Sequence, residues 1–294
     1  MIAKLDLEEI KNYMIDLAKK GGIMMKSVNP SVDDSCEKNN SADRVTATDK
    51  AIEAMVKSGM AIKYPDIEFL GEETFKDGQK LTDEPTLVCD PIDGTLNFIH
   101  GFPNYAISLA LTVCKAPIIG VVYNPARGDL FTAIKGRGAF LTRWDGTESA
   151  LPIRPQADPI NKLASCLCAL EYGNDRQSHK WELRTHMVDR LLSKNGGMAH
   201  SLRSSGSAAL DFCYVAAGWL DIFWEGGCWI WDVAAGFVIA QEAGGIVVGA
   251  NPGDWNPSLE GRSYFAVRGA ASGQREVVEE VWELMGDRRF TFNS

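Results

Sequence analysis

Two aspartates stand three residues apart in the segment Asp90-Pro91-Ile92-Asp93-Gly94-Thr95, directly after the apolar run Leu87-Val88-Cys89. The apolar run predicts a buried strand, so both carboxylates would lie at the end of that strand rather than on a solvated face. Pro91 fixes φ and stiffens the turn between the two acids. Gly94 allows a ligand to approach the backbone closely, and Thr95 supplies a hydroxyl group. If a helix starts here, the backbone N–H groups of Gly94 and Thr95 would favour a bound anion.

Three further acidic segments occur in comparable surroundings. Asp49 opens a helical pattern, Glu72-Glu73 follows a short apolar run, and Asp232 begins another helical pattern. Carboxylates gathered beside an anion site are electrostatically reasonable only when a cation lies between them. Ligands that are all oxygens favour a hard ion, with Mg²⁺ ahead of Ca²⁺ or Mn²⁺. The four segments together therefore predict a magnesium site that also accepts an anion.

Each acidic segment also has a simpler interpretation. Asp-Pro and Asp-Gly pairs are common in turns, so residues 90–95 could form an ordinary loop. Glu72-Glu73 could be a solvated surface pair. Asp49 and Asp232 could be helix caps or first-turn acids that the helix dipole favours. The metal interpretation is preferred because all four segments occur in one chain.

The elements that must position the first acids are helices and short strands. Apolar residues from Ile10 to Ala18 recur at helical spacing and predict a helix that ends near Gly21-Gly22. Residues 31–44 are polar and predict a loop or a flexible hairpin. A second helix is predicted from Thr46-Ala47-Thr48-Asp49 to Tyr64-Pro65. Between residues 86 and 142 short apolar runs are separated by Gly, Pro and Asn, which predicts sheet strands at 87–88, 107–113, 118–123, 130–134 and 140–141.

The second half alternates between strands and helices. Strands are predicted near 163–170, 220–224, 246–248 and 264–267, and helices around 181–192, 207–217, 233–242 and 277–285. Sheets interleaved with helices indicate a layered α/β body. We expect one catalytic unit over residues 1–294, with an N-terminal α+β half (about 1–150), a C-terminal α/β half (about 151–294) and the site at their junction.

Composition narrows the class of protein. The chain has 294 residues, of which 45% are hydrophobic and 23% are charged, so it is typical of globular proteins. Asp and Glu number 39 against 30 Lys and Arg, a net charge of −9, which argues against a nucleic-acid partner. No stretch approaches the roughly 20 apolar residues of a membrane helix. The acidic start lacks the features of a secretory signal, and the seven cysteines fit no disulfide framework or zinc spacing, so we expect reduced thiols in a cytoplasmic protein.

The four acidic segments, in this order, resemble the inositol monophosphatase family of Mg²⁺-dependent, typically lithium-sensitive phosphatases. The resemblance covers nearly the whole chain from about Leu5 to the last predicted helix. Its most specific element is the run from Asp90 to Phe98. Trp231-Asp232-Val233-Ala234-Ala235-Gly236 and Glu242-Ala243-Gly244-Gly245 support it. The segment Gly226-Gly227-Cys228 looks particularly like fungal members. The resemblance implies an α/β (α+β) fold, a layered αβαβα sandwich of the sugar-phosphatase type.

The resemblance implies a set of metal ligands at matching positions. Glu72, Asp90 and the backbone carbonyl of Ile92 match the ligands of a first Mg²⁺. Asp90, Asp93 and Asp232 match the ligands of a second, with Asp90 bridging. Glu72 is also matched to a third, more loosely held ion, so the family implies two to three Mg²⁺ per subunit.

The resemblance also implies catalytic and substrate-binding residues. Thr95 and Asp49 match the pair that orients and deprotonates the attacking water, and Glu72 is counted with them as catalytic. Lys38 matches a lysine on a flexible loop near the site. Leu96 stands where many members carry a second threonine, a change that we expect to be neutral. Ser207 also replaces a common threonine, so the resemblance implies the chemistry more firmly than the ring selectivity. The residues matched to phosphate or inositol contacts are Asp93, Gly94, Thr95, Arg203, Gly206, Ser207, Ala208, Glu225 and Asp232.

The function implied is hydrolysis of myo-inositol monophosphates to myo-inositol and phosphate by in-line attack of water. The partner is a small-molecule phosphate monoester, with no nucleic acid and no membrane, and family members are usually homodimers. Three alternatives stay open at this point. The first is a related lithium-sensitive phosphatase acting on 3′-phosphoadenosine nucleotides, fructose 1,6-bisphosphate or histidinol phosphate. The second is a catalytically silent regulatory homologue, and the third is a metal-buffering protein.

Overall fold

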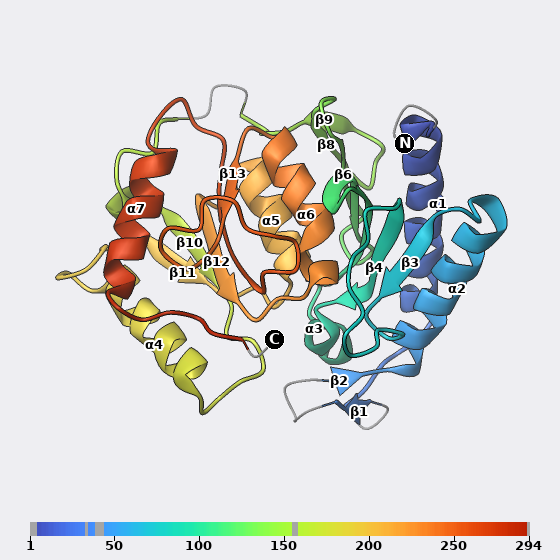
Figure 1. Ribbon diagram of the computed structural model, residues 1–294, viewed down its shortest axis with the longest axis horizontal. Helices are drawn as coiled ribbons and strands as arrows, with labels where there is room; N and C mark the ends of the chain where they lie inside the picture. Colours follow the sequence, from blue (N-terminus) through green and yellow to red (C-terminus); the bar gives the residue numbers. More distant parts are fainter. Residues whose placement is uncertain (1–4, 33–34, 39–43, 155–157, 293–294) are drawn as a thin grey trace.

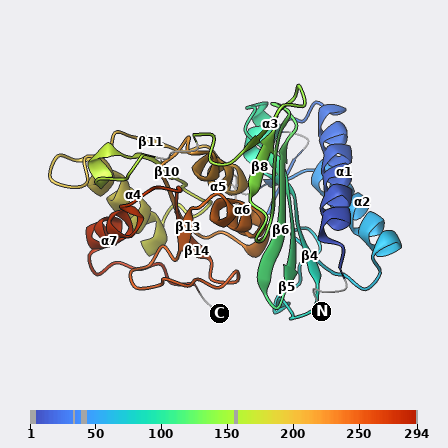
Figure 2. The ribbon, with the colours of Figure 1, turned by 90° about the horizontal axis from the view of Figure 1, so that it is seen from above.

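Helices and sheets alternate in five layers in the computed structural model, which describes residues 5–32, 35–38, 44–154 and 158–292 (Figures 1 and 2). The layers run, in order, α1 and α2, a seven-stranded sheet, α5 and α6, a five-stranded sheet, and α4 and α7. This is the αβαβα sandwich that the sequence resemblance implies. The helices are α1 (Leu7–Lys26), α2 (Ala47–Lys63), α3 (Thr95–His100), α4 (His179–Leu192), α5 (Ala208–Ala217), α6 (Ile230–Glu242) and α7 (Gln274–Met285).

The seven-stranded sheet contains all five strands predicted between residues 86 and 142. Figure 2 shows it nearly edge-on, with α1 and α2 on one side and α5 and α6 on the other. Every residue of its strands β4 and β5 is buried, because helices cover both faces, and this explains their unbroken apolar runs. β3 pairs with β4 in parallel, and the other neighbours are antiparallel. Its strands, in spatial order, are β3 (Glu68–Gly71), β4 (Thr86–Asp93), β5 (Ala106–Val113), β6 (Ala116–Asn124), β7 (Asp129–Ile134), β8 (Ala139–Thr142) and β9 (Glu148–Ala150).

The five-stranded sheet is mixed. β11, β10 and β12 run parallel, and β14 is antiparallel to both β12 and β13. Two predicted boundaries are wrong. Residues 163–165 form a 3-10 turn, so the strand starts at Leu167. The N–H of Leu220 bonds to the carbonyl of Tyr214 and finishes α5, so the next strand starts at Ile222. In spatial order the strands are β11 (Ser201–Arg203), β10 (Leu167–Leu170), β12 (Ile222–Gly226), β14 (Ser263–Val267) and β13 (Ile246–Val248).

The first helix continues beyond the glycine pair at which it was predicted to end. Gly21 and Gly22 are buried against the large sheet, and α1 ends at Lys26 with Ser27 as its cap. A Cβ on Gly22 would lie 2.5 Å from the ring of Tyr123, and one on Gly21 would lie 3.0 Å from Ile107. The two glycines therefore serve close helix–sheet packing rather than helix termination.

The predictions for residues 31–64 agree with the structure where it describes them. β1 (Cys36–Glu37) and β2 (Arg44–Val45) form an antiparallel hairpin, and residues 39–43 between them lie outside the described residues. α2 begins after Thr46 and ends before Tyr64.

All seven cysteines are free thiols. Within the described ranges, each helix is too short or too polar to traverse a lipid bilayer.

Candidate active site

The end of β4 carries the two aspartates of the central motif. Asp90 and Asp93 are 2% and 7% exposed, and the pairing of β4 with β5 shifts register between them. The N–H of Ile92 donates to Oδ1 of Asp90 at 3.0 Å. The irregularity turns both carboxylates toward one cavity, because a regular strand would place residues 90 and 93 on opposite faces.

A third carboxylate joins them from the other end of the chain. Asp232 lies in the first turn of α6, where the N–H of Trp229 donates to its Oδ2 at 2.7 Å. One oxygen from each of Asp90, Asp93 and Asp232 lies within 4.8 Å of the others. The capping interpretation and the metal interpretation of Asp232 are therefore compatible, since the carboxylate caps the helix and also belongs to a three-acid group.

The three acids repel one another, and two of them, Asp90 and Asp93, are buried while Asp232 is partly exposed. Burial, followed by the charges of Glu72, Asp93 and Asp232, raises the pKa of Asp90 well above its usual range. Burial, Asp93 and Glu72 do the same to the pKa of Asp232. Burial raises the pKa of Asp93 to about 7, although a hydrogen bond from Ser207 opposes the shift. A hard divalent cation would remove this repulsion, and the donors are the oxygens that such a cation prefers.

Glu72 reaches the same edge through the parallel strand β3. Its N–H donates to the carbonyl of Cys89 at 3.1 Å, so Glu72 follows β3 beside the end of β4. It lies outside the three-acid group, and its Oε1 accepts from Nζ of Lys38 at 2.7 Å. Lys38 also bonds to Glu73 at 2.6 Å. Burial raises the pKa of Glu72 to about 7, although Lys38 opposes the shift. The predicted hairpin lysine is thus placed at the acidic site.

The two carboxylate oxygens of Asp49 make different contacts, one with the helix cap and one with the active site. Oδ2 accepts from the N–H of Thr46 at 2.9 Å and from the Thr46 hydroxyl, which forms the capping box of α2. Oδ1 lies 3.4 Å from the hydroxyl of Thr95, which also lies 3.0 Å from the carbonyl oxygen of Ile92. Asp49 is 1% exposed, and burial raises its pKa. Thr95 therefore stands between the cavity and a buried carboxylate.

The start of α5 holds Asp93 from the opposite side. The hydroxyl of Ser207 and the N–H of Ala209 both donate to Oδ2 of Asp93, the latter at 2.9 Å. Gly94 has a φ of 89°, and a Cβ there would lie 2.9 Å from the carbonyl oxygen of Gly206. Only glycine fits both the left-handed conformation and this close approach between the two segments.

These groups surround a cavity of about 360 Å³. Arg203 is the predicted substrate contact that does not line it. The side chain of Arg203 is exposed, and its Nη1 bonds to the hydroxyl of Ser201 at 2.8 Å and to the carbonyl of Leu202 at 2.9 Å. Asp49 lies behind Thr95, and Lys38 lines an adjoining cavity. The predicted residues that line the 360 Å³ cavity are Glu72, Asp90, Ile92, Asp93, Gly94, Thr95, Gly206, Ser207, Ala208, Glu225 and Asp232.

The sequence reasoning assigned no role to several lining residues, namely Asn97, Glu171, Tyr172, Gly173, Arg176 and Ser204, of which Glu171 and Asn97 make the most informative contacts. Glu171 follows β10, and its carboxylate accepts from the hydroxyl of Ser204 at 3.0 Å, from the N–H of Gly206 at 3.0 Å and from the N–H of Ser205. Nδ2 of Asn97 donates to the carbonyl of Ser205 at 2.7 Å. Both residues support the loop before α5. Glu171 comes directly after an apolar strand, the same signal that singled out Asp90, whereas Asn97 lies within the motif from Asp90 to Phe98 but was assigned no role there.

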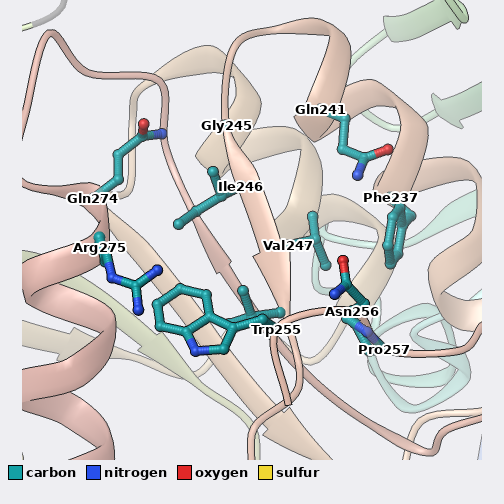
Figure 3. A pocket seen from close by; sticks show the side chains of 11 residues that line it. Phe237, Gln241, Gly245, Ile246, Val247, Trp255, Asn256, Pro257, Gln274 and Arg275 are labelled. Carbon is teal, nitrogen blue, oxygen red and sulfur yellow. The ribbon is translucent and has the colours of Figure 1, made fainter. Parts of the chain in front are cut away.

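A second cavity, of about 530 Å³, shares no lining residue with the first (Figure 3). It lies beside β13 and the start of α7. The Arg275 guanidinium is 4.2 Å from the centre of the Trp255 ring, and Figure 3 shows Gln241 and Phe237 across from them. None of the described residues that line it is an Asp, Glu, His or Cys, so it offers no donor set for the predicted metal chemistry.

The five-layer sandwich and its buried acid group define a phosphatase of a metal-dependent class. The profile of the inositol monophosphatase family matches residues 6–286, and the chain belongs to that family. It is 43% identical to inositol monophosphatase 2 of Saccharomyces cerevisiae, over 94% of each chain. It is 37% identical to inositol monophosphatase 1 of Sus scrofa, over 93% of this chain and 94% of the relative. The solved structure of the extragenic suppressor protein suhB from Bartonella henselae matches with a TM-score of 0.77 at 27% identity, over 95% and 99% of the two chains.

Proposed function

We propose that this protein hydrolyses myo-inositol monophosphates to myo-inositol and phosphate by in-line attack of water. One observation carries the proposal. The three-acid group and the Thr95–Asp49 pair line or adjoin a single cavity, in a chain 37–43% identical to named inositol monophosphatases over most of its length. Glu225 and Ser207 line the same cavity, so groups suited to hydroxyl recognition lie beside groups suited to phosphate chemistry.

We propose Mg²⁺ as the cofactor, with two to three ions per subunit. Asp90, Asp93, Asp232 and Glu72 would hold them, together with the carbonyl of Ile92. These donors fit a hard cation because all are oxygens, and because Asp90, Asp93 and Asp232 lie close together, with Asp90 and Asp93 buried. When bound, the ions supply Lewis-acid stabilisation of the charge that develops on the attacking and leaving oxygens.

The protein's own groups manage the proton and the phosphate. In our proposal, the attacking water gives its proton to the Thr95 hydroxyl as Thr95 passes its own proton to Asp49. Asp49 suits this role because burial raises its pKa, which makes it a stronger base than an exposed aspartate. The N–H groups of Gly94 and Thr95 would bind the phosphate. The water oxygen then bonds to phosphorus as the ester P–O bond breaks, and the leaving oxygen takes a proton from a solvent water to give the free hydroxyl of the polyol.

The substrate ring would lie toward the five-stranded sheet. Ser207 and Ala208 begin α5, and Glu225 ends β12, so the polyol would contact the C-terminal half while the phosphate contacts the end of β4. Glu225 is 8% exposed and would accept hydrogen bonds from ring hydroxyls, which favours a polyol over an alkyl phosphate. Because the substrate would contact both halves of the chain, we propose that residues 1–294 work as one catalytic unit.

A phosphate-release assay tests the proposal. The panel is myo-inositol 1-, 3- and 4-phosphate, adenosine 3′,5′-bisphosphate, fructose 1,6-bisphosphate and histidinol phosphate, each with and without Mg²⁺. We expect the highest kcat/KM for an inositol monophosphate, and only with Mg²⁺. A higher value for another ester would overturn the substrate assignment. Mg²⁺ binding without phosphate release would overturn the enzymatic function.

The family resemblance supports three further properties, which belong to the same proposal. We propose inhibition by Li⁺, a cytoplasmic location and a homodimer. Two exposed aromatic residues, Trp144 at 79% and Phe102 at 54% exposure, are compatible with a subunit interface. Adding Li⁺ to the phosphate assay, cell fractionation and sedimentation equilibrium test the three properties separately.

A further inference from the structure

The adjoining cavity that Lys38 lines, the third described for this protein, meets the catalytic cavity at Glu225. Its volume is about 410 Å³, and it shares Glu72, Gly173, Glu225 and Asp232 with the catalytic cavity. Arg184, from α4, lines its wall. No sequence motif pointed to Arg184, and it has no part in the phosphate chemistry above.

Arg184 and Glu225 both carry unpaired polar atoms in a buried setting. Arg184 is 2% exposed and Glu225 is 8% exposed. Nη2 of Arg184 donates to the carbonyl of Gly226, but its Nε and Nη1 have no partner among the described residues. Oε2 of Glu225 is likewise without a partner in the described part of the chain. Buried donors and acceptors are normally satisfied, so this pair calls for a ligand.

The surroundings of the pair favour a neutral group over a second anion. Lys38 bonds to two carboxylates, Lys180 lies 3.7 Å from a third, and Arg262 donates to two backbone carbonyls. A second phosphate would therefore meet the two unpaired nitrogens of Arg184, but it would also meet the carboxylates of Glu225, Glu72 and Asp232, which would repel it. A hydroxyl group can accept from Arg184 and donate to Glu225 at the same time.

We propose that Arg184 and Glu225 together read a hydroxyl group of the substrate's leaving group, at the boundary between the two cavities. Arg184 is then a specificity-determining residue. This inference rests on the proposed function and deepens it, because it names the feature of the polyol that the enzyme recognises. The same geometry applies to any hydroxylated phosphate ester, so the inference can be tested without inositol.

The test compares substrates matched in carbon skeleton. Myo-inositol 1-phosphate is paired with cyclohexyl phosphate, and glycerol 2-phosphate with isopropyl phosphate. The polyol preference is the ratio of kcat/KM within each pair. We expect Arg184→Met to lower this ratio at least tenfold, mainly through KM for the polyol, and Arg184→Lys to restore part of it. Arg190→Met, on the same helix but outside both cavities, is the matched control and should keep the parent ratio.

A double variant tests whether the two residues read the same hydroxyl. If they do, the effect of Arg184→Met on the ratio should be smaller in a Glu225→Gln background than in the parent. An unchanged ratio in folded Arg184→Met, or equal losses for both members of a pair, would overturn the inference. If Arg184→Met does not fold, Arg184→Lys and Arg184→Gln carry the same comparison.

The outcomes for the inference and for the proposed function are distinct. If the parent enzyme hydrolyses glycerol 2-phosphate in preference to isopropyl phosphate but does not hydrolyse inositol phosphates, the proposed substrate assignment is overturned. The effect of Arg184→Met on the glycerol pair still tests the inference about Arg184. Calorimetric binding of myo-inositol in the presence of inorganic phosphate gives a readout without turnover. Weaker binding by Arg184→Met than by Arg190→Met supports the inference, and equal binding contradicts it.

Discussion

The hydroxyl of Thr95 lies 3.4 Å from Oδ1 of Asp49, a residue 46 positions earlier in the chain. The contact joins the start of α3 to the start of α2 and connects the cavity to a buried carboxylate. We expect Thr95→Ala to lower kcat by about 10²–10⁴-fold, the contribution typical of positioned acid–base groups. Thr95→Ser keeps the hydroxyl and should retain most of the activity. Steady-state kinetics on myo-inositol 1-phosphate measures both. Equal losses in the two variants would show that the hydroxyl is not what matters.

Asp93→Asn should separate metal binding from folding. The side-chain amide keeps the size of the carboxylate but loses its charge, so the site should bind Mg²⁺ more weakly and turnover should fall by orders of magnitude. The fold should persist, since Ser207 can still donate to the remaining oxygen. Mg²⁺ activation curves and thermal unfolding check the two statements. Near-normal hydrolysis at limiting Mg²⁺ would contradict the assignment of Asp93 as a ligand.

Removal of divalent ions should make stability depend on pH in a particular direction. The pKa of Glu72 rises from 4.5 to about 7 on folding, so the folded protein binds this proton more tightly than the unfolded chain. The metal-free protein should therefore lose stability as pH rises through this window and reach its lowest stability above pH 7. Thermal unfolding in a chelator at about pH 5.5 and about pH 8 measures this, and Mg²⁺ should restore stability mainly at the higher pH. A Tm that rises with pH in the chelator would contradict the prediction.

Gly22→Ala tests the reason that α1 continues through its glycines. Alanine favours a helix, but its Cβ would lie 2.5 Å from the Tyr123 ring. We expect a net loss of about 1–3 kcal/mol in the free energy of unfolding, the usual cost of overpacking. Lys20→Ala, at an exposed position of the same helix, is the control and should be nearly neutral. Urea unfolding measures both, and a stabilised Gly22→Ala would show that the sheet can move away.

The sequence alone predicted the structure correctly where the local residue pattern and the tertiary environment agree. The apolar runs of β4 and β5 are unbroken because helices cover both faces, and Thr46 with Asp49 forms the predicted cap. It failed at Gly21-Gly22, where the absence of a side chain serves packing against a distant strand. Arg184 could not be found either, because its significance depends on partners that only the fold brings near it.

The Ser207–Asp93 hydrogen bond closes a segment of 114 residues. Asp232 enters the acid group from still farther along the chain, so the site exists only after both sheets have packed on α5 and α6. Contacts so distant in sequence form late and slowly during folding. In a refolding experiment, helical circular dichroism should therefore return before phosphate release does. On this expectation the active site is the last part of the molecule to form, and phosphate release then measures complete assembly.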